Sequence, residues 1–115
     1  MLFIQYPPCS TCKKAKTWLV AHGIEFEDRN IKTDNPSFDE LKRWQEVSGL
    51  PLKRFFNTSG LLYKSLGLKD KLPTMTAEEQ LRLLASDGML VKRPIAVKGN
   101  MVLTGFKETE WETLI

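Results

Sequence analysis

Two cysteines, Cys9 and Cys12, lie where a predicted strand gives way to a predicted helix, and the 115-residue chain has no others. The apolar run 1–6 favours a buried strand, Pro7-Pro8 ends it, and residues 11–21 have a helical pattern. A helix N-terminus carries unpaired N–H groups and a partial positive charge, and both favour a thiolate. A second thiol three residues later can attack a mixed disulfide formed on the first. The spacing therefore predicts a reversible dithiol–disulfide centre.

The composition is typical of a soluble globular chain. Hydrophobic residues make up 42% and charged residues 27%, and no apolar run approaches the ~20 residues that span a bilayer. The net charge of +3 comes from scattered lysines, so we expect no direct contact with nucleic acid and no membrane contact. No signal-peptide pattern is present, so we expect a cytoplasmic protein. We also expect it to be a monomer. In that compartment a close cysteine pair is more often catalytic, redox-sensing or metal-binding than a permanent disulfide.

The remaining patterns predict one domain, 1–115, of the α/β class. After the first strand and helix we expect a strand at 24–31 and a block of helices at about 37–90. A closing β-β-α unit should follow, with strands at 94–97 and 101–104 and a helix at 108–114. Capping boxes predict helix starts at Ser37 and Thr76, and Gly99-Asn100 predicts a hairpin. The helix after Ser37 is expected to place Val47 on its buried face, and residues 68–74, between two helices of the block, have no predicted element. Trp18, Trp44 and Trp111 are expected to be packing residues. The order β-α-β, helices, β-β-α is that of a thioredoxin-like mixed sheet with a helical insertion. A CxxC motif near a βαβ unit agrees with this fold.

We interpret Cys9 as the nucleophile and Cys12 as the resolving thiol, against two alternatives. A structural zinc site usually needs four ligands, and besides the two cysteines the chain has a single histidine, His22. His22 is also ~20 Å along the helix from Cys9, too far to act as its base, so we expect it to be structural or at the surface. Two inert buried thiols would leave the Pro-Pro-Cys-Ser-Thr-Cys setting unexplained.

Arg93 and Pro94 form a second candidate group. A proline that opens this strand in a thioredoxin-like fold is a candidate cis-proline, although only ~5–6% of X–Pro bonds are cis. Arg93 would direct a fixed positive charge and several donors toward Cys9, which lowers the pKa of a thiol or holds an oxyanion. Ser10 and Thr11 are expected to cap the helix or to hydrogen-bond the Cys9 thiolate.

Several separated motifs resemble the arsenate reductase/Spx family of thioredoxin-like proteins over nearly the whole chain. They are residues 6–15 (YPPCSTCKKA), 62–68 (LYKSLGL), 92–97 (KRPIAV) and Gly105-Phe106. The resemblance implies a thioredoxin-like sheet with a helical insertion, and Cys9 as the reactive cysteine.

The chain differs from the arsenate reductases of this family at three positions. Those enzymes use three arginines around the oxyanion; Arg93 matches one, whereas Asn57 and Phe106 occupy the places of the others. Each lost donor costs such a transition state a few kcal/mol. The reductases also lack a cysteine at the Cys12 position, so the chain is similar to the CxxC-bearing members, which include Spx. Gly105-Phe106 also resembles Spx, whereas residues 62–68 resemble a reductase-like branch.

We therefore expect thiol–disulfide oxidoreduction by Cys9, Cys12 and Arg93, with Ser10, Thr11 and Pro94 in support. The resemblance leaves two alternatives: a redox-sensing regulator of the Spx type, which binds the RNA polymerase alpha subunit, and an arsenate reductase. No metal or nucleotide cofactor is expected. The expected partners are an oxidised protein or small-molecule substrate and a thiol reductant, either glutathione or a thioredoxin system.

Overall fold

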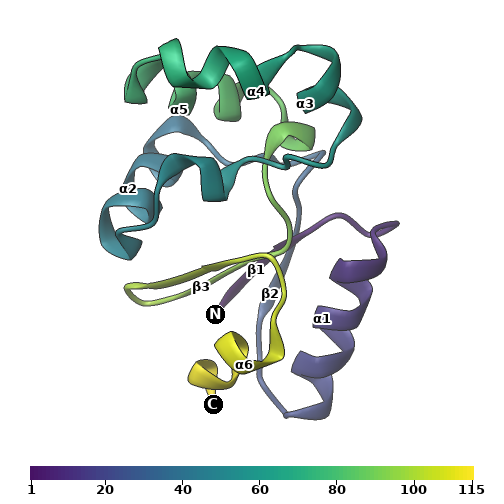
Figure 1. Cartoon of the computed structure of the whole chain (residues 1–115). Helices are drawn as coiled ribbons and strands as arrows, with labels where there is room; N and C mark the ends of the chain where they lie inside the picture. The colour runs from purple at the N-terminus through teal and green to yellow at the C-terminus, as the bar shows by residue number, and fades with distance from the viewer.

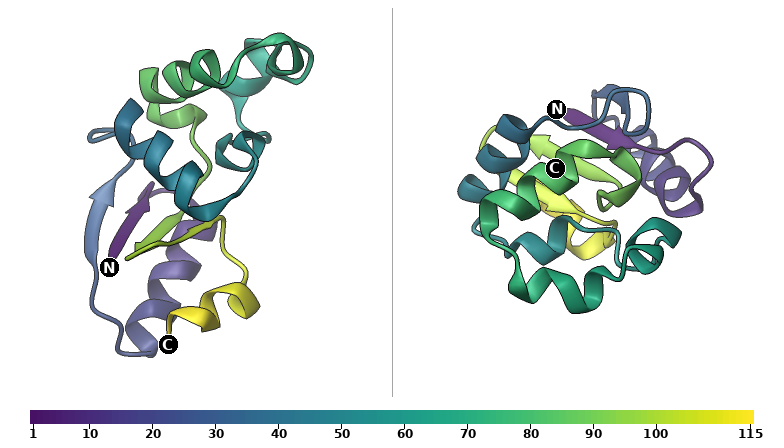
Figure 2. Two further views of the ribbon diagram at one scale, coloured as in Figure 1. Left: turned by 90° about the vertical axis from the view of Figure 1, so that its left-hand side faces the viewer. Right: turned by 90° about the horizontal axis from the view of Figure 1, so that it is seen from above.

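The computed structural model describes all 115 residues and contains a four-stranded mixed sheet between two groups of helices (Figures 1 and 2). The strand order is β2-β1-β3-β4. The first two strands of the chain are parallel, whereas β1–β3 and β3–β4 are antiparallel pairs. The strands are β1 (Leu2–Gln5), β2 (Glu27–Asn30), β3 (Ile95–Lys98) and β4 (Met101–Thr104).

The helices lie on both faces of the sheet. Figure 1 shows α2, α3, α4 and α5 above the sheet and α1 and α6 below it. The helices and 3₁₀ turns are α1 (Ser10–Ala21), α2 (Phe38–Ser48), η1 (Leu52–Phe55), α3 (Leu61–Ser65), α4 (Leu68–Lys71), η2 (Leu72–Thr74), α5 (Ala77–Ser86), η3 (Gly88–Leu90), α6 (Glu108–Trp111) and η4 (Glu112–Leu114). We call residues 38–90 the helical insertion. The predicted element order and thioredoxin-like fold class are confirmed. No helix combines the length and apolar character that a bilayer crossing requires.

Both predicted capping boxes start helices of the insertion. The Ser37 hydroxyl accepts from the Glu40 N–H at 3.1 Å, and the Glu40 carboxylate accepts from the Ser37 N–H at 3.0 Å. Thr76 and Glu79 make the same exchange at the start of α5. Each box satisfies two N–H groups that the first helical turn leaves unpaired, and a cap of this kind contributes about 1 kcal/mol.

The sheet divides the core into two layers because successive strand residues point to opposite faces. Phe3 and Ala96 pack with Trp111 against α1 and α6. The neighbouring residues Ile4 and Ile95 pack against the helical insertion. The predicted assignment of all three tryptophans to packing is confirmed, since Trp18, Trp44 and Trp111 are each less than a tenth exposed.

Backbone contacts join the insertion to the segment before β3. Phe56 and Val91 form an isolated antiparallel bridge. On either side of it, the Lys92 N–H donates to the Phe55 carbonyl and the Asn57 N–H to the Leu90 carbonyl, both at 2.8 Å. These bonds fix the residue before Arg93 against the chain that leaves η1. The insertion thereby forms one wall of the site described below.

Three local predictions needed correction. The strand predicted at 24–31 is β2, only Glu27–Asn30, because Ile24 and Phe26 pack below the sheet instead of pairing. Val47 was expected on the buried face of its helix, yet it is 37% exposed. Residues 68–74, which had no predicted element, form α4 and η2, which are too short to show a helical period.

Candidate functional site

Cys9 and Cys12 occupy the start of α1, as the sequence predicted. Cys9 is the N-cap residue, and its N–H donates to the Tyr6 carbonyl at 2.9 Å. Cys12 lies in the first turn with its side chain fully buried, whereas Cys9 is partly exposed. Both thiols are free, so the structure represents the reduced form. A partly exposed sulfur with a buried sulfur beside it is an arrangement suited to attack on a substrate followed by internal resolution.

The pKa of Cys9 is lowered although burial acts to raise it. Nearby donors outweigh the loss of solvation: the Cys12 N–H, the Arg93 guanidinium, the Cys12 thiol and the Thr11 N–H all favour the anion. Two of these donors are orphan N–H groups of the first helical turn, which are aimed at the N-cap by helix geometry. The helix start and Arg93 thus stabilise the nucleophilic form.

Cys12 has the opposite environment, which raises its pKa to about 12. Burial is the largest cause, and a hydrogen bond and charge from Cys9 add to it. The Tyr6 N–H, 3.5 Å from the Cys12 sulfur, acts in the other direction. At neutral pH the pair therefore carries its negative charge on Cys9 and a proton on Cys12.

Arg93 and Pro94 lie beside this pair. The Arg93-Pro94 peptide bond is cis, as the fold analogy suggested. The Arg93 guanidinium lies over the Tyr6 ring, with its central carbon 4.9 Å from the ring centroid. The hydroxyls of Ser10 and Thr11 do not cap the helix, since the cap is Cys9 and no side chain bonds there. Thr11 acts on Cys9 through its backbone N–H instead.

Cys9 opens into a pocket of about 610 Å³ built from four separate segments. Its cationic residues are Arg54, Lys92, Arg93 and Lys107, and no aspartate or glutamate lines it. Cationic clefts with low-dielectric walls concentrate anions at the surface. The pocket is therefore suited to an anionic group next to the Cys9 sulfur.

The two positions where the resemblance to arsenate reductases implies arginine also line this pocket. They are Asn57, which is 9% exposed, and Phe106, whose ring packs on Trp111 at 5.1 Å. Gly105 precedes Phe106 with φ +74°, a conformation that favours glycine. The Trp111 indole N–H donates to the Gly105 carbonyl at 2.9 Å and so fixes this part of the wall.

Thr104 is the one pocket residue with a buried polar atom that finds no partner. The residue is 6% exposed, and its Oγ1 makes no hydrogen bond. Sequence reasoning missed Thr104 and the cations Arg54, Lys92 and Lys107. The signal for the cations was proximity along the chain, since each is within three positions of Asn57, Arg93 or Phe106.

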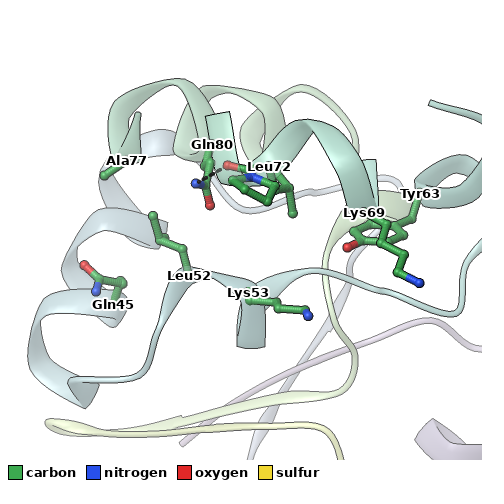
Figure 3. Close-up of a pocket in the computed structure, with 9 residues that line it drawn as sticks. Gln45, Leu52, Lys53, Tyr63, Lys69, Leu72, Ala77 and Gln80 are labelled. Atoms are coloured by element: carbon green, nitrogen blue, oxygen red, sulfur yellow. Dashed lines mark hydrogen bonds between the residues drawn. The ribbon is translucent and has the colours of Figure 1, made fainter. Parts of the chain in front are cut away.

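Two other features lie outside this site. His22 stacks on Trp18 with ring centroids 4.2 Å apart, and its Nδ1 contacts the Trp18 carbonyl at 2.8 Å, so its predicted structural role agrees with its contacts. A second cavity of about 420 Å³ lies inside the insertion, where Figure 3 shows Leu52 and Leu72 along it and Lys69 with Tyr63 at one end. It contains no cysteine, and no group of three or more metal-ligating side chains occurs in the molecule.

Comparison with known proteins identifies the relatives of this chain. The ArsC family model matches residues 4–114. The protein YusI of Bacillus subtilis is 54% identical over 112 residues, covering 97% of this chain and 95% of YusI. The regulatory protein MgsR of Bacillus subtilis is 33% identical over 110 residues, covering 96% of this chain and 86% of MgsR. The crystal structure of an ArsC family related protein from Bacteroides fragilis superposes with a TM-score of 0.97 at 60% identity, covering 99% of this chain and 96% of that one. With a family model matched over nearly its full length and relatives this similar, the chain belongs to the ArsC family.

Proposed function

We propose that the protein is a thiol–disulfide oxidoreductase that uses Cys9 as nucleophile and Cys12 as resolving thiol. The observation that carries the proposal is the asymmetry of the pair: Cys9 is partly exposed in a cationic pocket with a lowered pKa, and Cys12 is buried beside it with a raised one. The exposed sulfur is ionised and accessible, while the protected one keeps its proton. Only one of the two can then meet a substrate.

In the first step the Cys9 thiolate attacks one sulfur of a substrate disulfide. A bond forms between the two sulfurs, the substrate S–S bond breaks, and one half of the substrate leaves as a thiolate. Arg93 and the amide N–H groups of Thr11 and Cys12 hold the attacking anion in place beforehand. The other half of the substrate remains attached to Cys9 as a mixed disulfide.

In the second step Cys12 attacks the Cys9 sulfur of that mixed disulfide. Cys12 must first lose its proton, which the substrate thiolate released in step one can accept, and the structure provides a reason why this loss becomes easier after step one. Part of what raises the pKa of Cys12, after burial, is the hydrogen bond and charge of Cys9. Once Cys9 is bonded to substrate it carries no charge, so that contribution disappears. The second thiolate then leaves, and two electrons have passed from the cysteine pair to the substrate.

The resulting Cys9–Cys12 disulfide must be reduced before another cycle. An external dithiol of the thioredoxin type, or two molecules of a thiol such as glutathione, would restore both thiols by the same exchange. Reducing thiols of this kind are available in the cytoplasm, the compartment we expect for this protein. The exchange uses sulfur chemistry throughout, and no metal or nucleotide cofactor enters the proposal.

A trapping experiment tests the proposal. Reduced Cys12→Ser protein is mixed with a disulfide, and the mass of the product is measured. We expect one adduct per chain on Cys9, stable because no resolving thiol is present. The matched Cys9→Ser protein should form none, since its remaining thiol is buried and protonated. If Cys12→Ser forms no adduct with any disulfide tested, or Cys9→Ser forms it equally well, the assigned roles are wrong.

A redox-sensing regulator is the second candidate, favoured by the 33% identity to the regulatory protein MgsR. In this case the Cys9–Cys12 disulfide would change binding to a protein such as the RNA polymerase alpha subunit. Two assays on one preparation separate the candidates: turnover of a disulfide with excess reductant, and binding of the alpha subunit to the reduced and oxidised protein. Absence of turnover together with redox-dependent binding would favour the regulator.

Arsenate reduction is the third candidate, which membership of the ArsC family raises. Asn57 and Phe106 replace two expected arginines, although Arg54, Lys92 and Lys107 bring positive charge to the same pocket. Lys92 and Lys107 lack the planar fork that binds an oxyanion through two parallel hydrogen bonds, so only Arg54 and Arg93 offer one in this pocket. We therefore expect disulfides to be reduced much faster than arsenate when both are offered with the same reductant.

A further inference from the structure

Tyr6 contacts Cys9, Cys12 and Arg93, the three residues whose side chains set the charge of the cysteine pair. Its carbonyl accepts from the Cys9 N–H at 2.9 Å, and its N–H donates toward the Cys12 sulfur at 3.5 Å. Its ring lies under the Arg93 guanidinium, 4.9 Å from the ring centroid. The first two contacts are made by the backbone and would survive any side-chain substitution. The ring contact is the one that the identity of residue 6 controls.

Apart from the Cys9 sulfur, whose anion it favours, the Arg93 guanidinium has only the Tyr6 ring as an attractive partner that would fix its orientation. No carboxylate is within ion-pair distance, since the salt bridges of the molecule involve only Lys16, Arg29 and Arg82 as cations. The Arg93 side chain also donates no hydrogen bond to any oxygen of the protein. Its charged neighbours in the pocket are the cations Arg54, Lys92 and Lys107, which repel it. An aromatic face attracts a guanidinium and stacks with its plane.

We propose that Tyr6 is a positioning residue whose ring holds the Arg93 guanidinium against the Cys9 sulfur. Any consequence of this contact for turnover rests on the proposed function. Its effect on the ionisation of Cys9 does not depend on any substrate. The groups that act on the Cys9 sulfur are the Cys12 thiol, the Thr11 and Cys12 N–H groups and Arg93, and the cations Arg54, Lys92 and Lys107 line the same pocket. Among these, Arg93 is the only one that touches Tyr6 through the ring.

The test compares Tyr6→Leu with Tyr6→Phe, using the thiolate absorbance of the reduced protein against pH. The leucine variant removes the ring, and the phenylalanine variant keeps it and removes only the hydroxyl. A cation–π contact of this kind corresponds to about a two- to fivefold change in the ratio of thiolate to thiol. At pH values below the pKa of Cys9, we expect the thiolate fraction of Tyr6→Leu to be smaller than that of the natural protein by this factor. Tyr6→Phe should titrate as the natural protein does. Tyr6→Met, also ringless and apolar, replaces Tyr6→Leu if the latter does not fold.

A second background separates positioning from a general loss of packing. In Arg93→Gln protein the ring has no guanidinium to hold, so adding Tyr6→Leu should leave the titration of Cys9 unchanged. The proposal is overturned if the ringless variants titrate as the natural protein does, or if their effect is equally large in the Arg93→Gln background. These readings hold even if no disulfide is ever turned over, so failure of the oxidoreductase proposal remains distinguishable from failure of this one.

Discussion

Replacing Thr104 by valine should make the protein more stable while it alters the wall of the functional pocket. The Thr104 hydroxyl is buried and makes no hydrogen bond, although the residue lies in β4 opposite Ile95. Leaving a hydroxyl unpaired in the interior costs about 1–3 kcal/mol relative to water. Valine has nearly the same shape, suits a strand equally well, and removes the unpaired group. Taking the lower end of the range, we expect a gain of about 1 kcal/mol.

The assay is urea unfolding followed by tryptophan fluorescence, with a thermal melt in parallel. A gain of about 1 kcal/mol corresponds to about 4 °C in the melting temperature for a chain of this size. Thr109→Val is the matched control, since Thr109 is exposed on α6, and its effect should stay within about 0.5 kcal/mol. Thr104→Ser, which keeps the hydroxyl and loses the methyl group, should be less stable than the natural protein. A clear loss of stability in Thr104→Val would show that the hydroxyl has a partner in solution and that the reasoning is wrong.

Three further predictions concern charge. Arg93→Gln should raise the pKa of Cys9 and reduce its thiolate fraction at acid pH about tenfold, which corresponds to the lower end of the energy of a hydrogen bond to a charged group. The rate of Cys9 alkylation against pH measures this, and an unchanged profile would contradict it. Arg29 hydrogen-bonds Glu40 at 2.7 Å and 2.9 Å and lowers its pKa, so Glu40→Gln should cost about 1 kcal/mol at neutral pH. The cost is measured by urea unfolding at a series of pH values. It should shrink as the pH falls below the ~4.3 of an unfolded glutamate and vanish once the pH is below the lowered pKa of Glu40, because the natural side chain is then protonated too. Finally, the cationic pocket predicts that a carboxylate-bearing disulfide reacts about tenfold faster than the amine-bearing cystamine at low salt, a ratio that should shrink with added salt and with Lys92→Gln; equal rates would contradict it.

The fold could be predicted largely because its signals are local. The capping boxes at Ser37 and Thr76, the Gly99-Asn100 turn and the proline break after the first strand each depend on a few neighbouring residues. The start of β2 could not be predicted in this way. Ile24 and Phe26 are apolar and fit a strand pattern, but tertiary packing below the sheet decides their place. A four-residue helix such as α4 is likewise too short to leave a period in the sequence.

The site divides along the same line. The cysteine pair and its helix N-terminus follow from one continuous segment, so the sequence was sufficient to place them. The cap itself differed, because Cys9 takes the position that Ser10 or Thr11 was expected to serve with a hydroxyl. Among the cations of the pocket, Arg54 is 38 residues before Lys92, and Lys107 follows 15 residues after it. Their convergence depends on how the insertion is joined to β3. The contact between Tyr6 and Arg93 spans most of the chain, and no local pattern could have indicated it.

Ionisation of the two thiols in the reduced protein tests the account most directly. The thiolate absorbance is titrated for the natural protein, for Cys12→Ser and for Cys9→Ser, so that each sulfur is assigned. We predict that Cys9 titrates below the ~8.5 of a free cysteine and that Cys12 stays protonated well above that pH. A Cys9 that titrates at or above the free value, or a Cys12 that ionises first, would contradict the claim that helix amides and Arg93 prepare Cys9 for attack.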